Sequence, residues 1–181
     1  MKNQETAKAI ESESIDKSLG SSDRGQWMSV WTLEKFHTPN GESIENLQPY
    51  EVDVTKGNIL VNAGIQLLED LLMGAGGNAF NNANSYLGVG DSSAAAGATQ
   101  TDLQAATNKV RKAMEATFPS KSAQTMTFKS IFASGDGNWE WLEWGIFNAS
   151  TAGTMLNRKV VSKGTKESGD TWTLTVTVTI S

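Results

Sequence analysis

The chain has 181 residues, of which 38% are hydrophobic and 19% charged, and its formal net charge at pH 7 is −5. This length suits one domain with a substantial core and is short for two. An acidic chain whose basic residues cluster only in the short stretch 109–112 lacks the charge footprint of a nucleic-acid binder, so we expect no DNA or RNA partner. The chain contains no cysteine, which excludes disulfides, thiol catalysis and cysteine-bound zinc.

The first 25 residues form a polar segment without an aromatic residue. Its aliphatic side chains are scattered, at Ile10, Ile15 and Leu19, and it ends in a run of turn-forming residues at 20–25. Such a segment buries too little apolar surface to offset the entropy lost on ordering. We therefore predict an extended N-terminal arm over residues 1–25 that a partner subunit holds in place. The alternative is an arm that folds back on its own domain.

One helix is predicted over about 59–73, where apolar residues recur at helical spacing. Asn58 suits the N-terminal cap and Gly74 suits the stop. Polar residues interrupt this stretch and it is too short to cross a bilayer, while residues 1–22 lack the apolar core of a secretory signal. We therefore expect no membrane partner and synthesis in a cytoplasm.

Residues 26–181 show the pattern of a single β domain. Bulky strand formers gather at 27–36, and Asn40-Gly41 predicts a hairpin to a weaker strand near 44–54. A capping box at 101–104 predicts one helical turn. Further strands, separated by turn-forming residues, are predicted at 86–90, 110–118, 125–133, 139–148, 154–161 and 171–180.

The last of these strands has the clearest pattern, because threonines alternate with large apolar residues from Thr171 to Ile180. Such alternation predicts one buried face and one wet face. Regular short strands with turns between them predict a mainly β fold, either an antiparallel β-sandwich or a jelly-roll-like barrel, with the helix covering an open edge or end.

Three patterns that could carry catalysis do not meet its requirements. Residues 88–93 partly match a dinucleotide fingerprint, but serine replaces the third glycine and no helix follows directly. The Gly-Asp-Ser within them also occurs at the nucleophile of some serine esterases, yet the only histidine, His37, lies upstream in an apparent hairpin. Glu140 and Glu143 are three apart on a strand, so they point to opposite faces and cannot flank one glycosidic bond. We predict no catalytic residue and no enzyme activity.

For metals, one histidine and no cysteine leave only oxygen ligands, and no Asp/Asn run has the spacing of a calcium loop. We therefore predict no metal site and no cofactor. Glu143 falls in a row with aromatic residues, where a carboxylate needs a cationic partner. Arg111 or Arg158 of neighbouring strands would suit, which predicts a structural ion pair.

Core packing accounts for most of the six tryptophans. Trp27 or Trp31 is a candidate for an intersubunit contact, a setting in which tryptophan is favoured. The aliphatic residues of the arm, Ile10, Ile15 and Leu19, are candidates for the same role. An exposed tryptophan platform that stacks on carbohydrate is an alternative.

Several short stretches, in a fixed order from about 58 to 180, carry a resemblance to known proteins. They are Asn58-Ile59-Leu60-Val61-Asn62-Ala63-Gly64, Tyr86-Leu87-Gly88-Val89-Gly90-Asp91-Ser92, Glu143-Trp144-Gly145-Ile146-Phe147-Asn148, Gly153-Thr154-Met155-Leu156-Asn157-Arg158-Lys159-Val160, and Lys166 leading into the Thr/Val strand. As an ordered set they resemble a family of small virion structural proteins of tailed bacteriophages.

This resemblance implies a structural role in the virion with no catalytic residues to carry over. A short acidic chain with one compact domain and an arm suits a capsid decoration or cement protein that binds capsomers of the major capsid protein. The alternatives are a tail, collar or fibre-attachment component and a host-glycan-binding module. We expect other virion proteins as partners, a homo-oligomer, and a location in the virion after assembly in the host cytoplasm.

Overall fold

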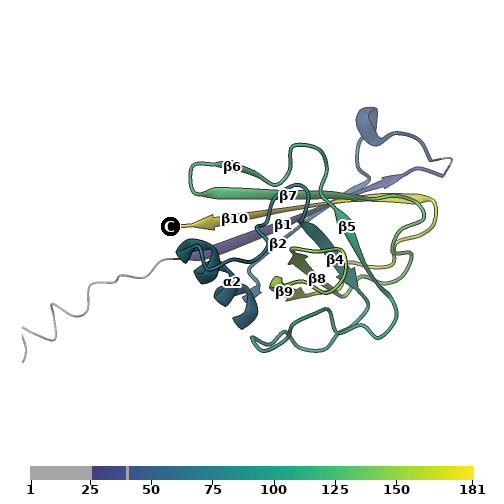
Figure 1. The fold of residues 1–181 in the computed structure, drawn as a ribbon. Coiled ribbons are helices and arrows are strands. Elements are labelled where there is room, and N and C mark those ends of the chain that lie inside the picture. The colour runs from purple at the N-terminus through teal and green to yellow at the C-terminus, as the bar shows by residue number, and fades with distance from the viewer. Residues whose placement is uncertain (1–25, 40) are drawn as a thin grey trace, which may run out of the picture.

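The structure, a computed structural model, describes residues 26–39 and 41–181. It has two antiparallel sheets of five strands each, which face each other as a β-sandwich (Figure 1). Sheet A has the strand order β2-β1-β10-β7-β6, and sheet B has the order β3-β9-β8-β4-β5. The prediction of a mainly β antiparallel sandwich with one α-helix is confirmed for this part of the chain. The predicted arm over residues 1–25 lies outside the described residues.

Runs of consecutive strands belong in turn to one sheet and then to the other. Sheet A contains β1 (Trp27–His37), β2 (Glu51–Lys56), β6 (Ser120–Ser122), β7 (Thr125–Phe132) and β10 (Asp170–Ile180). Sheet B contains β3 (Ile59–Leu60), β4 (Tyr86–Gly90), β5 (Lys109–Ala113), β8 (Glu143–Phe147) and β9 (Met155–Val160). The helices are the 3-10 helix η1 (Ile44–Asn46) and the α-helix α2 (Asn62–Met73).

The core lies between the two sheets and is built from alternate residues of each strand. Trp172 and Leu174 of β10 face Trp144 and Ile146 of β8 across it, and all four are buried. Trp31 of β1 stacks on Trp144 with ring centroids 5.4 Å apart and planes inclined by 16°. Each such side chain contributes roughly 1.5–3 kcal/mol through burial. The aromatic residues therefore join the two sheets.

The outward-facing threonines of β10 are wet along only part of the strand. Thr171 and Thr173 are buried, and the Thr171 hydroxyl lies 2.8 Å from the hydroxyl of Thr38. The predicted wet face is therefore wrong for the start of the strand, because the connection after β1 covers it there. Thr175, Thr177 and Thr179 are partly exposed.

The predicted first hairpin is correct in pairing and wrong in its turn. β1 and β2 are antiparallel neighbours with Trp31 opposite Thr55, but they are joined by the long connection 38–50. The second strand begins at Glu51 rather than near Ile44, because the Ser43 hydroxyl accepts from the amide of Glu45 and caps η1. Asn40, half of the predicted turn, lies outside the described residues.

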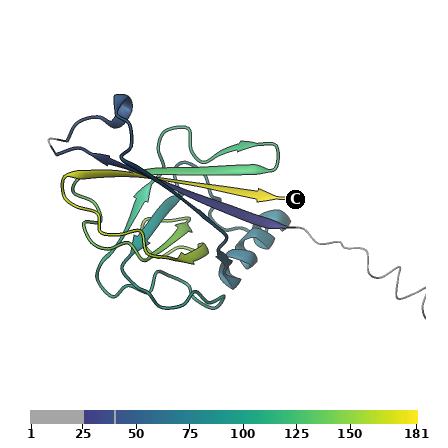
Figure 2. The ribbon, with the colours of Figure 1, turned by 180° about the vertical axis from the view of Figure 1, so that it is seen from behind.

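Helix α2 begins three residues later than predicted. Ile59 and Leu60 pair with β9 as strand β3, and Val61, not Asn58, is the N-cap residue. The two residues thereby gain ladder hydrogen bonds that a helical start could not give. The predicted stop is confirmed, since Gly74 adopts the left-handed conformation with φ of 69°. The helix lies at the end of the sandwich where β1 begins and β10 ends (Figures 1 and 2).

Two predictions around the strands of sheet B are also wrong. Residues 101–104 form no helical turn, because the amides of Gln104 and Ala105 donate to Glu143 of another strand. Strand β8 starts at Glu143 rather than at Trp139.

Neither helix in the described part of the chain has the length and apolar character that crossing a membrane requires.

Candidate functional site

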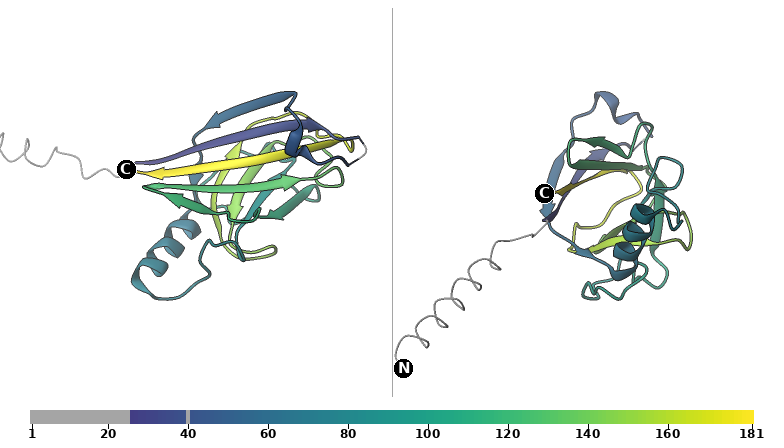
Figure 3. Two further views of the ribbon diagram at one scale, coloured as in Figure 1. Left: turned by 90° about the horizontal axis from the view of Figure 1, so that it is seen from above. Right: turned by 60° about the vertical axis from the view of Figure 1, so that its left-hand side comes forward.

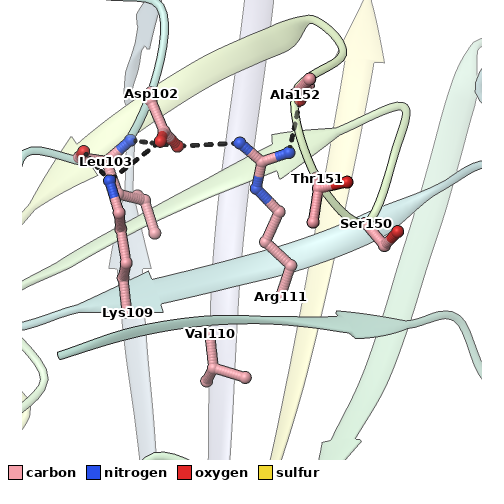
Figure 4. Close-up of a pocket in the computed structure, with 8 residues that line it drawn as sticks. All are labelled: Asp102, Leu103, Lys109, Val110, Arg111, Ser150, Thr151 and Ala152. Atoms are coloured by element: carbon pink, nitrogen blue, oxygen red, sulfur yellow. Dashed lines mark hydrogen bonds and ion pairs between the residues drawn. The ribbon is translucent and has the colours of Figure 1, made fainter. Parts of the chain in front are cut away.

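A hollow of about 230 Å³ lies on the outer face of sheet B, where β5 meets the segment after β4 and the turn after β8. Figure 4 shows the residues that line it, which are Asp102, Leu103, Lys109, Val110, Arg111, Ser150, Thr151 and Ala152. Cationic and anionic side chains meet here, which makes the hollow a candidate binding or catalytic site.

Arg111 occupies the centre of this hollow, and both terminal nitrogens of its guanidinium hydrogen-bond within the protein. One terminal nitrogen donates to the carbonyl oxygens of Ala149, at 3.0 Å, and Ala152, at 2.6 Å. The other donates to the carboxylate of Asp102 at 2.8 Å (Figure 4). The guanidinium carbon also lies 3.6 Å from the ring centroid of Phe147. An anionic ligand would have to displace Asp102 to reach this arginine.

Asp102 is held in its ionised form by its neighbours. Lys109 donates to it at 2.9 Å, and the amide of Leu103 donates at 2.8 Å. Burial alone would raise the pKa of Asp102, but hydrogen bonds from Arg111 and Lys109 outweigh burial and bring the pKa below its ordinary value of 3.8. An ionised, fully paired carboxylate is unsuited to act as a general acid. The polar residues of this hollow therefore have a structural role: they join β5 to Asp102 and to the turn after β8.

Two glycines make room for Phe147 beneath this arginine. Arg111, Gly88, Gly145 and Arg158 lie opposite one another in one row across β5, β4, β8 and β9. A Cβ atom on Gly88 would lie 2.6 Å from the Phe147 ring, and one on Gly145 would lie 3.2 Å from it. The glycines of the Gly88-Val89-Gly90 motif thus serve close packing on sheet B, rather than a phosphate cradle.

The buried ion pair on this face is formed by Glu143 and Arg158. Both side chains are 0% exposed, and a guanidinium nitrogen of Arg158 lies 2.7 Å from a Glu143 carboxylate oxygen. Of the two arginines considered as partners for Glu143, Arg158 makes the pair. Arg111 instead pairs with Asp102.

The same two side chains fasten the segment between β4 and β5 to sheet B. Glu143 accepts from the amides of Gln104, at 2.9 Å, and Ala105, at 2.7 Å. Arg158 donates to the side chain of Gln100 at 2.8 Å and to the carbonyl oxygen of Ala94 at 2.9 Å. Because these contacts all lie within the protein, we interpret the pair as a latch that holds the segment 91–108 on sheet B.

His37, the only histidine, forms a cluster with Asp170 and Tyr50. Its Nδ1 lies 2.8 Å from Asp170, and its ring stacks on Tyr50 with centroids 4.0 Å apart. The Tyr50 hydroxyl donates to Asp170 at 3.0 Å. Burial, reinforced by Asp170, raises the pKa of Tyr50 to about 12. No hydroxyl among the described residues hydrogen-bonds to His37, so the cluster ties the two ends of the connection 38–50 and is no catalytic triad.

Lys166 is a buried cation without a carboxylate in hydrogen-bond contact. It is 0% exposed and donates to the carbonyl oxygen of Ala133 at 2.8 Å and to Asn138 at 3.0 Å. Burial lowers the pKa of Lys166, while Asp170 and Asp136 oppose that change. The lysine caps the turn between β7 and β8.

The tryptophans are core residues. Trp31 is wrong as an intersubunit contact, because it is fully buried against Trp144 between the sheets. Trp27 is partly buried at the start of β1, and none of the six tryptophans is exposed, which leaves no stacking platform for carbohydrate. The other predicted contacts, Ile10, Ile15 and Leu19, lie outside the described residues.

Sequence patterns did not indicate that Asp102, Asp170 and Lys166 belong to polar clusters. Asp170 and Lys166 contact residues far away in the chain, and the contact of Asp102 with Arg111 depends on the path of the loop between them. Within the ranges 26–39 and 41–181, no group of three or more His, Asp or Glu side chains is placed to hold a metal ion.

Several large apolar side chains, in contrast, are exposed, among them Val52 and Val54 of β2 and a set at one end of the molecule. This set comes from the start of β1, from α2 and from the end of β10, which share that end (Figures 1 and 3). We call this set the apolar end, which consists of Met28, Ile65, Leu72, Met73 and Ile180. Exposed apolar clusters of this kind mark surfaces that bind another protein, a membrane or a ligand.

No protein-family model matches this chain, and no curated protein matches it either.

Proposed function

We propose that this chain is a structural protein of a tailed-bacteriophage particle, most specifically a capsid decoration protein. It binds capsomers through its N-terminal arm and the surface of its β domain, and it has no enzymatic role. The observation that carries this proposal is a contrast: the polar clusters are hydrogen-bonded within the protein, whereas large apolar side chains are exposed to solvent. Arg111 and Glu143 form hydrogen bonds within the protein, whereas Leu72 and Met73 are 88% and 81% exposed.

The first support is chemical. An active site needs a polar group that is free to meet a substrate, and a binding protein needs apolar surface that a partner can cover. The most polar hollow of sheet B has its arginine and its carboxylate paired with each other at 2.8 Å. The side chains of the apolar end are between 38% and 88% exposed. The arrangement favours a protein whose role is to bind a partner through its apolar surface.

The assignment to a phage particle is supported by the resemblance of the stretches from about 58 to 180 to small virion proteins. Three of those stretches have defined roles in the structure. Gly88 and Gly145 admit Phe147 on sheet B, and Glu143 pairs with Arg158. A family that keeps this order of motifs would keep this latch. A decoration protein of this kind adds interface between capsomers and so opposes the expansion pressure of the packaged genome.

A tail, collar or fibre-attachment component is the second candidate within the same class. It would have the same domain and the same arm but far fewer copies per particle. A host-glycan-binding module is disfavoured, because none of the six tryptophans is exposed.

Binding of a truncated protein to particles tests the proposal. A variant that lacks residues 1–25 should keep its fold, checked by circular dichroism and by thermal unfolding, and should not occupy particles that lack the full chain. The full chain, added to the same particles, is the positive control. Full occupancy by the truncated variant would contradict binding through the arm.

A further inference from the structure

The side chains of the apolar end are more exposed to solvent than large apolar residues usually are on the surface of a monomer. Leu72 and Met73, at the last turn of α2, are 88% and 81% exposed, and Met28, Ile65 and Ile180 are exposed on elements that meet at the same end of the sandwich. Single exposed apolar residues are common in monomers, but a group of this size normally contacts something.

Helix α2 has apolar side chains beyond the side that packs on the sandwich. Its buried residues are Gly64 and Leu67, and Gly64 lies against the backbone of Leu156 in β9. Ile65 and Leu72 are seven residues apart and therefore lie on one stripe, which borders this buried side, while Gln66, Glu69 and Asp70 are exposed on the opposite side. The stripe extends the apolar surface of the helix past its contact with β9 and leaves it exposed.

The segment that precedes the described domain begins at this same end. Gln26 is fixed to Ser181 by a pair of backbone hydrogen bonds, so the chain enters the fold beside the end of β10 (Figure 2). Twenty-five residues precede this point, and their aliphatic side chains include Ile10, Ile15 and Leu19. Leu19 stands seven residues before Gln26 and can reach about 25 Å from it at full extension.

The composition between Leu19 and Gln26 favours a reversal of direction. Residues 20–25 read Gly-Ser-Ser-Asp-Arg-Gly, which are turn formers. A short linker of this kind holds a tethered segment at millimolar effective concentration near its attachment point. The arm of the same chain therefore competes strongly for the apolar end against any free partner.

From this placement we infer that the arm folds back on its own domain in the free protein and covers the apolar end with Ile10, Ile15 and Leu19. The arm is then the built-in occupant of a docking surface on α2. The consequence for assembly rests on the proposed function: a capsomer that binds the arm uncovers Leu72 and Met73, which become available to a second virion protein only on the particle.

The absence of native cysteine makes a disulfide test direct. The double variant Leu19→Cys with Leu72→Cys, in the full chain and purified without particles, is oxidised at low concentration. We expect an intramolecular disulfide, seen as loss of free thiols in a species that stays monomeric on a non-reducing gel. The matched control is Leu19→Cys with Leu47→Cys, since Leu47 is also exposed but lies beside η1, away from α2. We expect it to cross-link more slowly, by about tenfold or more, the ratio that one buried leucine is worth.

Three results would overturn the inference. Disulfide-linked dimers as the main product would assign the arm to another copy. Equal rates in the two double variants would mean that the arm has no preferred site, and no cross-link in either would mean that it does not reach the domain. Each result concerns the free protein, so particle binding by the full chain would be unaffected and the two proposals can fail separately.

Discussion

The guanidinium of Arg158 lies 2.7 Å from the carboxylate of Glu143, and neither side chain is exposed to solvent. The two residues are brought together by β8 and β9 of sheet B. Between them they bind four points of the segment 91–108, which has no helix or strand of its own. This buried pair therefore orders the long segment together with the contacts of Asp102 to Arg111 and Lys109.

Glu143→Gln should destabilise the domain by about 3–5 kcal/mol, because it leaves the buried charge of Arg158 without its counter-ion. Urea unfolding measures the loss. Hydrogen exchange should locate it, with faster exchange at the amides of Gln104 and Ala105 than elsewhere in sheet B. Glu140→Gln is the matched control, since Glu140 is exposed and accepts one hydrogen bond from Ser162. Equal effects of the two substitutions would contradict the role of the latch.

Gly90→Ala should also disturb the latch, for a steric reason. A Cβ atom at Gly90 would lie 2.7 Å from a carboxylate oxygen of Glu143 and 3.0 Å from the side chain of Ala105. Overpacking of this kind costs about 1–3 kcal/mol. Gly135→Ala tests the same change in open space, where no atom lies within 4 Å, and should stay within about 0.5 kcal/mol of the unsubstituted protein. Thermal unfolding of both variants decides between these expectations.

The pattern of residues predicted the parts of the structure that depend on local sequence. The alternation of β10 and the stop of α2 at Gly74 follow from side-chain period and from glycine's tolerance of positive φ. The predicted start of the helix failed because Ile59 and Leu60 find a better partner in β9, far along the chain. A local pattern contains no information about that partner.

The same limit explains the polar clusters. Strand parity placed Glu143 on one face with a cationic partner, but the choice of Arg158 over Arg111 depends on the path of the segment 91–108. That segment also uses the amides of Gln104 and Ala105 for Glu143, which removes the predicted helical turn at 101–104. Loop paths are set by such distant contacts, so composition alone did not predict them.

Asp102 should give the domain a stability contribution that depends on pH. Because the folded pKa of Asp102 lies below its ordinary value of 3.8, the contribution is present above that value and is lost as pH falls through the folded pKa. The difference in urea midpoint between the unsubstituted protein and Asp102→Asn should be largest near neutral pH and should close in acid. A difference that widens as pH falls would contradict the pairing of Asp102 with Arg111 and Lys109.

Tyr50 should titrate at high pH. Its pKa is raised from 10.0 to about 12, so folding favours the protonated phenol and the stability from this group falls as pH rises from 10.0 to about 12. Tyrosinate absorbance of the unsubstituted protein minus that of Tyr50→Phe should show a single step near pH 12. A step near 10.0 would mean that Tyr50 does not lie against Asp170 as the structure has it.

The most direct test of the central claim is the copy number of this protein in purified particles. Particles that contain it, separated on a density gradient and run on a stained gel, give its amount relative to the major capsid protein. A decoration protein is present in a fixed proportion within a few-fold of the capsid subunits. A few copies per particle would instead indicate a tail component. Absence of the protein from purified particles would contradict a structural role in the virion.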